Sequence, residues 1–103
     1  MLFKDNVTIT FTTTIQTIMR AFERACNEVV GASYQPTCTS GLEGTHSLES
    51  GHYHGRAVDF RKQTIPAMLI PMVLERTRTI LGADYLVLEE PDHIHIQRQK
   101  NSF

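Results

Sequence analysis

The segment SGHYHGRAVDF, residues 50–60, places two histidines and an aspartate around a turn of small residues. Imidazole nitrogens and carboxylate oxygens are the usual ligands of catalytic zinc, which takes about three protein ligands and leaves one position for water. His52 and Asp59 lie on either side of Gly55, so the chain can bend between them. The segment therefore predicts part of a metal site, with at least one further ligand supplied from elsewhere.

The other histidines of the chain lie close to this segment or near the C-terminal end. The metal-capable candidates in the two clusters are His46, His52, His54, Asp59, His93 and His95. Residues 93–96 alternate histidine with isoleucine, which is typical of a strand with one apolar face. Spacing alone leaves two interpretations open, a metal site and a purely structural role. A loop histidine bonded to a carboxylate and a cross-strand histidine are both ordinary structural features without a metal.

The first half of the chain predicts a strand, a helix and a second strand. Residues 7–11 alternate apolar side chains with threonine, which indicates a short strand. Apolar side chains then recur at helical spacing over 15–30, and Gly31 supplies a stop. Residues 36–40 are expected to form a strand, and 41–51 a polar loop with several glycines.

The second half predicts a strand, a helix and a hairpin. Residues 57–61 are a plausible strand, followed by a helix with Thr64 as its N-cap that ends at Gly82. Pro71 lies inside that helix and should kink it or split it in two. Residues 85–89 and 93–97 are the strands of the hairpin, and the sequence EPD forms its turn.

Side-chain alternation assigns the two faces of the hairpin. The residues expected in the core are Leu86, Leu88, Ile94 and Ile96. Those expected on the opposite face are Tyr85, Val87, Glu89, His93, His95 and Gln97. The same alternation in 57–61 turns Asp59 outward. Three strands would then present their reactive residues on one side of a sheet, with Glu89 among them.

Composition limits the class of protein. The chain has 103 residues, 41% of them hydrophobic, and a formal net charge of −1. We expect a single domain over 1–103 that binds no nucleic acid. No stretch reaches the roughly 18 apolar residues of a membrane span, and the N-terminus lacks the pattern of a secretory signal, so we expect no membrane insertion and synthesis in the cytoplasm. Cys26 and Cys38 are expected to be buried thiols, although one disulfide stays open.

The motif S-x-H-x-x-G-x-A-x-D, formed by Ser50, His52, Gly55, Ala57 and Asp59, resembles the first zinc motif of the D-Ala-D-Ala carboxypeptidase family of zinc peptidases. HSLESGHYHGRAVDF and GADYLVLEEPDHIHI also resemble segments of the hedgehog signalling domain, which shares the fold and the zinc site. The resemblance covers residues 45–60 and 82–96. It implies an α+β fold with a small antiparallel sheet, two helices packed on one face, and a zinc site on the other.

The resemblance also implies a set of site residues. His52, Asp59 and His95 would bind one Zn²⁺ ion, and Glu89 would act as the general base toward a zinc-activated water. His46 would assist catalysis, for example by stabilising an oxyanion. Residues with a supporting or substrate-contacting role would be Ser50, His93, Asp92 and Arg56.

Alternative residues exist for two of these roles, the general base and the group that binds the substrate carboxylate. Glu90 is within reach in sequence but alternation turns it to the other face, and Asp92 precedes His95 by three residues and is expected in the turn. His54 is expected to be exposed and non-catalytic. Many wall peptidases carry an arginine after the Ser-Gly of an earlier strand, which holds a substrate carboxylate, whereas Leu42 follows Ser40-Gly41 in this chain. Arg56 and Arg98 are the possible substitutes.

The function that these features imply is a zinc metallopeptidase that cuts peptidoglycan stem peptides, as a carboxypeptidase or an endopeptidase. We expect a monomer, released to the cell wall as a phage lysis protein or carried in a virion. The alternative is a non-catalytic, hedgehog-like zinc-binding domain with a structural or binding role, such as a virion component.

Overall fold

The computed structural model describes residues 1–5, 12–40 and 56–99. Over these residues the protein is α+β, with a five-stranded sheet and two α-helices. The strands are β1 (Leu2–Phe3), β2 (Thr37–Ser40), β3 (Ala57–Arg61), β4 (Tyr85–Glu89) and β5 (His93–Arg98). The helices are α1 (Thr13–Val29) and α2 (Ile70–Leu81), the latter preceded by the 3₁₀ turn η1 (Ala67–Leu69).

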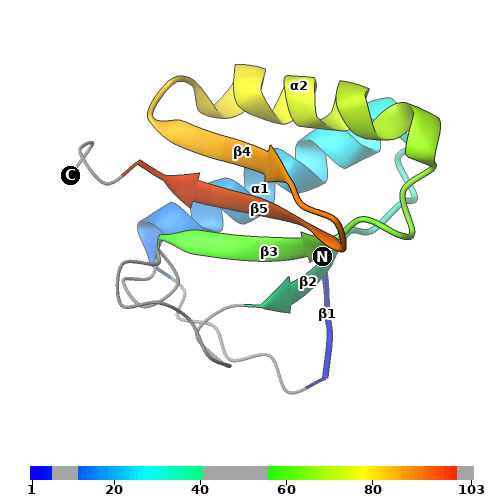
Figure 1. The fold of residues 1–103 in the computed structure, drawn as a ribbon, viewed down its shortest axis with the longest axis horizontal. Coiled ribbons are helices and arrows are strands. Elements are labelled where there is room, and N and C mark those ends of the chain that lie inside the picture. The colour runs from blue at the N-terminus through cyan, green and yellow to red at the C-terminus, as the bar shows by residue number, and fades with distance from the viewer. Residues whose placement is uncertain (6–11, 41–55, 100–103) are drawn as a thin grey trace.

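The sheet has the strand order β1-β2-β3-β5-β4. Three neighbouring pairs are antiparallel, but β1 runs parallel to β2, so the sheet is mixed and the prediction of an antiparallel sheet is wrong on this point. Helix α1 packs on β3 and β5, and α2 packs on α1 and β4 (Figure 1). Both helices therefore cover one face of the sheet, as the sequence predicted.

Helix α1 forms because its apolar side chains recur every three or four residues. Ile15, Ile18 and Phe22 lie on one face and are fully or almost fully buried. The side chain of Thr12 caps the N-terminus by accepting a hydrogen bond from the Ile15 amide at 3.1 Å. Gly31 follows the helix with a φ of 154°, a conformation that favours glycine. The predicted helix is confirmed.

The second predicted helix is divided, and Pro71 is the reason. The α-helical part begins at Ile70, so Pro71 lies in the first turn, where a missing amide hydrogen costs no intrahelical bond. Thr64 is not its N-cap; the Thr64 hydroxyl hydrogen-bonds the Tyr34 hydroxyl at 2.8 Å. Gly82, with a φ of 85°, ends the helix as predicted.

The hairpin forms where the sequence predicted it, but the predicted faces of β4 are wrong. Val87 pairs with Ile96 and is buried, whereas Leu88 pairs with His95 and is 37% exposed. The cause is the length of the loop. The Glu90 amide donates to the His93 carbonyl at 2.8 Å, so the connection has two residues rather than three. A shift of one residue turns every side chain of a strand to the other face.

The core lies between the helices and the sheet. Phe22 of α1 and Phe60 of β3 stack with their ring centroids 4.2 Å apart, and both are fully buried. Cys26 and Cys38 are buried free thiols, as predicted, and burial together with the nearby Glu23 carboxylate raises the pKa of Cys26 to about 12.

The predicted strand over 7–11 lies outside the described residues. Within those residues, no helix combines the length and the apolarity needed to cross a bilayer.

Candidate metal centre

Asp59, His93 and His95 meet on the face of the sheet that the helices leave uncovered. Asp59 of β3 pairs directly with His95 of β5, and His93 lies two residues away along β5 on the same face. One ligand atom from each side chain lies within 4.8 Å of the other two. The sheet therefore gathers one carboxylate and two imidazoles, which is a donor set that can hold a metal ion.

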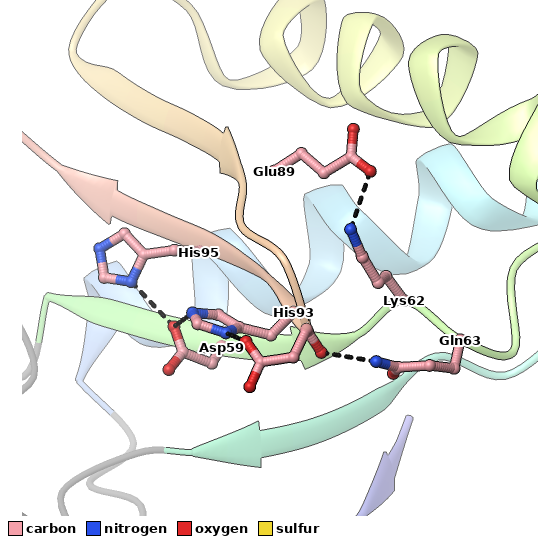
Figure 2. Close-up of polar contacts among 7 residues, drawn as sticks. Asp59, Lys62, Gln63, Glu89, His93 and His95 are labelled. Carbon is pink, nitrogen blue, oxygen red and sulfur yellow. Dashed lines mark hydrogen bonds and ion pairs between the residues drawn. The ribbon is translucent and has the colours of Figure 1, made fainter.

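The carboxylate of Asp59 lies between the two rings, as Figure 2 shows. Its Oδ1 atom is 2.8 Å from Nδ1 of His95 and 3.6 Å from Nε2 of His93. Asp59 is only 8% exposed. A buried anion between two ring nitrogens favours a cation at this point, because the surrounding dielectric screens its charge less than bulk water does.

The outer nitrogen of each ring is held by an acceptor. Nδ1 of His93 donates to Oδ1 of Asp92 at 2.7 Å, and Nε2 of His95 donates to Oε1 of Gln97 at 2.7 Å. Gln63 in turn donates to the Asp92 carbonyl at 2.9 Å. Such outer partners fix the orientation of ligating histidines in metal sites. The residues present thus fit a divalent ion, with the inner nitrogens facing Asp59.

Hydrogen bonding favours the protonated form of His95. Burial opposes its protonation, but the hydrogen bonds to Asp59 and Gln97 and the negative charges of Asp59 and Glu90 outweigh burial and raise the pKa of His95. Both ring nitrogens face acceptors, so both hydrogen bonds require the imidazolium. The hydrogen bond from His93 and its charge lower the pKa of Asp92.

The metal-free protein is expected to lose stability as the pH rises. The pKa of His95 is higher in the folded state than its unfolded value of about 6.5. The contribution of His95 to the free energy of unfolding is therefore complete below pH 6.5, and it is lost as the pH rises through the folded pKa. Urea midpoints measured in the presence of a chelator should fall over that window. A His95→Gln variant should lose this part of the pH dependence; an unchanged pH profile in the variant would contradict the assignment.

Glu89 does not lie on the same face of the sheet as the histidines. It pairs with Ile94, whose side chain faces the helices, so the prediction that it shares a face with His93 and His95 is wrong. Nζ of Lys62 lies 3.0 Å from Oε2 of Glu89, and Figure 2 shows this pair apart from the histidines. The role of general base predicted for Glu89 loses the support of a shared face and keeps only that of the family resemblance.

Glu90 takes the opposite orientation to the one predicted. The hydrogen bond from its amide to the His93 carbonyl places the two residues opposite each other across the hairpin. Directly opposed residues of an antiparallel pair share a face, so Glu90 lies on the histidine face. Sequence alternation could not reveal this, because it depends on the length of the turn.

Three of the predicted site residues, His46, Ser50 and His52, lie outside the described residues, as does His54, which was expected to be non-catalytic. Arg56 is described and is 6% exposed. The Arg98 amide donates to the Arg56 carbonyl at 2.9 Å, which extends the ladder between β3 and β5 by one residue. Alternation then puts Arg56 on the same face as Val58, away from the histidines.

An open polar pocket adjoins the centre. Its volume is about 380 Å³, and it is lined by Lys4, Thr39, Asp59, Arg61, Gln63, Asp92 and His93. Arg61 comes from β3, two residues after Asp59, and Lys4 follows β1. Sequence reasoning missed both cations. Alternation could have found Arg61, because residues 59 and 61 share a face, but nothing local indicates that Lys4 lies near β3.

No protein-family model and no curated protein matches this chain.

Proposed function

We propose that the protein is a zinc peptidase that hydrolyses peptidoglycan stem peptides. The observation that carries the proposal is the group formed by Asp59, His93 and His95, in which each ring keeps one nitrogen toward the carboxylate and the other on an acceptor. The substrate class and a hedgehog-like fold come from the resemblance of residues 45–60 and 82–96 to the carboxypeptidase and hedgehog families.

Zinc suits this donor set because it prefers imidazole and carboxylate ligands and has no redox chemistry. Asp59 and His95 would hold it, and the third ligand would be His52, as the motif implies, or His93, as its position beside Asp59 supports. Bound there, the ion would polarise the scissile carbonyl and lower the pKa of water. The hydrogen bonds from His93 to Asp92 and from His95 to Gln97 would keep the rings in place.

The polar pocket supports a substrate that carries a carboxylate. Arg61 and Lys4 supply two positive charges to the pocket that Asp59 and His93 also line. A guanidinium matches a carboxylate with two parallel hydrogen bonds. Arg61 would therefore bind the C-terminal carboxylate of a stem peptide, the role for which the sequence offered only Arg56 and Arg98.

The proposal is tested by digesting purified peptidoglycan sacculi and separating the released fragments. With zinc, the wild-type protein should release peptide fragments from sacculi, and removal of zinc should stop the release. Arg61→Met should raise KM about 10- to 100-fold, because it removes a charged hydrogen-bonding group worth about 1.5–3 kcal/mol. The kcat should change less, since Arg61 is proposed to bind rather than to react.

A wild-type protein that binds zinc stoichiometrically but releases nothing from sacculi would contradict the peptidase assignment and favour the non-catalytic alternative. An unchanged KM for Arg61→Met would leave the peptidase in place but remove Arg61 from carboxylate recognition. Lys62→Met serves as the matched control, because Lys62 is ion-paired to Glu89 outside this pocket.

A further inference from the structure

We propose that Glu90, and not Glu89, is the carboxylate that accepts the proton of the attacking water. This inference rests on the proposed peptidase function and adds a catalytic residue to it. It reverses the assignment implied by the family resemblance, and it follows from the geometry of the hairpin.

The register of the hairpin separates the two carboxylates. Glu89 pairs with Ile94, which is completely buried on the helix face. The next position along β4 is Glu90, whose amide donates to the carbonyl of His93 at 2.8 Å. Adjacent residues of a strand point to opposite faces. Glu90 therefore shares a face with His93 and His95, and Glu89 does not.

The surroundings of the two side chains agree with this division. Glu89 is exposed, and its carboxylate is 3.0 Å from the ammonium group of Lys62, so its charge is already paired. Glu90 is half-buried, and Lys62 forms its ion pair with Glu89. Strand pairing thus locates Glu90 on the face of the metal-capable group.

Glu90 also lies outside the set of candidate metal ligands, as a proton acceptor should. Among the described residues, the group whose ligand atoms lie within 4.8 Å of one another contains Asp59, His93 and His95 but not Glu90. A carboxylate near the site that does not ligate the metal keeps its lone pairs for proton transfer. The pocket that Asp59 and His93 line has room for a substrate next to the metal-capable group.

The proposed step balances in protons and electrons. As the oxygen of water forms a bond to the scissile carbonyl carbon, one water proton passes to the carboxylate of Glu90. When the C–N bond breaks, the electron pair of that bond stays on nitrogen, and the Glu90 carboxylic acid returns the proton to it. The products are a carboxylic acid and an amine, with Glu90 restored to its ionised form.

Two isosteric variants, Glu90→Gln and Glu89→Gln, test the assignment. Glu90→Gln should lower kcat for peptide release from sacculi by about 10²- to 10⁴-fold, which is the usual contribution of a general base. It should also raise the Kd for Zn²⁺ alone by about threefold to tenfold, because it removes a negative charge near the ion. Glu89→Gln should leave both quantities within about twofold of wild type.

A third variant separates charge from position. Glu90→Asp keeps the charge but shortens the side chain, so it should keep the wild-type affinity for Zn²⁺ and still lose at least about tenfold in kcat. Far-UV circular dichroism should be unchanged in all three variants, because the side chains carry no core packing.

The outcomes are distinguishable. Loss of hydrolysis in Glu89→Gln together with retention in Glu90→Gln would overturn the assignment but leave the peptidase function intact. Equal Zn²⁺ affinities for wild type and Glu90→Gln would overturn the placement of Glu90 beside the metal. A wild-type protein with no hydrolysis would overturn the catalytic role together with the proposed function, while the zinc titrations would still decide the placement.

Discussion

Asp59→Asn is expected to weaken Zn²⁺ binding by about 100-fold or more and to abolish peptide release. The carboxylate is the anionic member of the group, and its Oδ1 lies 2.8 Å from His95 and 3.6 Å from His93. Asparagine keeps the shape but removes the charge. The measurement is competition between the protein and a chelator of known affinity, with metal analysis of the purified protein.

The variant Asp92→Asn is compared with Asp59→Asn, and a smaller loss of Zn²⁺ affinity is expected. Asp92 contacts the outer nitrogen of His93 rather than the inner face of the group, so its loss should cost only about 10- to 100-fold in affinity, as is usual for an outer partner. Equal losses in the two variants would contradict the central position of Asp59. The same titration on His52→Ala and His93→Ala identifies the third ligand, because a variant that retains stoichiometric zinc has not lost one.

Phe60→Ala is expected to lower the free energy of unfolding by about 3–5 kcal/mol, the usual cost of removing a buried phenylalanine. Phe60 is fully buried and stacks on Phe22, so the substitution removes this aromatic contact between β3 and α1 and leaves a cavity. Domains of this size are stable by about 5–15 kcal/mol, so the variant should lose a large share of its stability. Urea unfolding followed by circular dichroism measures the loss.

Leu88→Ala is the control, and it also tests the hairpin register. Leu88 is 37% exposed on the histidine face, whereas its neighbour Val87 is 3% exposed in the core. We expect Leu88→Ala to cost no more than about 1 kcal/mol, in keeping with partly exposed positions. A loss from Leu88→Ala that matched the loss from Phe60→Ala would show that the strand is turned the other way and would weaken the case for Glu90.

Helix α1 and the strands β2 to β5 could be predicted because their signals are local. The apolar spacing of 15–30 and the stop at Gly31 sufficed for α1, since a helix buries one stripe whatever it packs against. Pro71 was expected to break the helix, but the start at Ile70 was not predicted, because the hydroxyl of Thr64, the expected N-cap, bonds Tyr34 from a distant part of the chain. The strand β1, only two residues long, carries no pattern that could have indicated it.

Part of the candidate site was also predictable. Asp59 and His95 were chosen as partners from their motifs, and the structure pairs them directly across β3 and β5. His93 was expected beside the site; its inner nitrogen faces Asp59 because residues 93 and 95 share a face. The cations of the adjoining pocket were missed, because Lys4 approaches only through the parallel pairing of β1 with β2.

The sequence by itself determined the chemical groups and the elements that carry them. Alternation in residues 93–96 and around Asp59 requires that the histidines and the carboxylate face away from the apolar core. Only the tertiary structure decided which glutamate joins them. Glu89 and Glu90 are chemically identical neighbours, and a two-residue turn instead of a three-residue turn exchanges their faces. That choice depends on the whole hairpin packing Val87, rather than Leu88, against the helices.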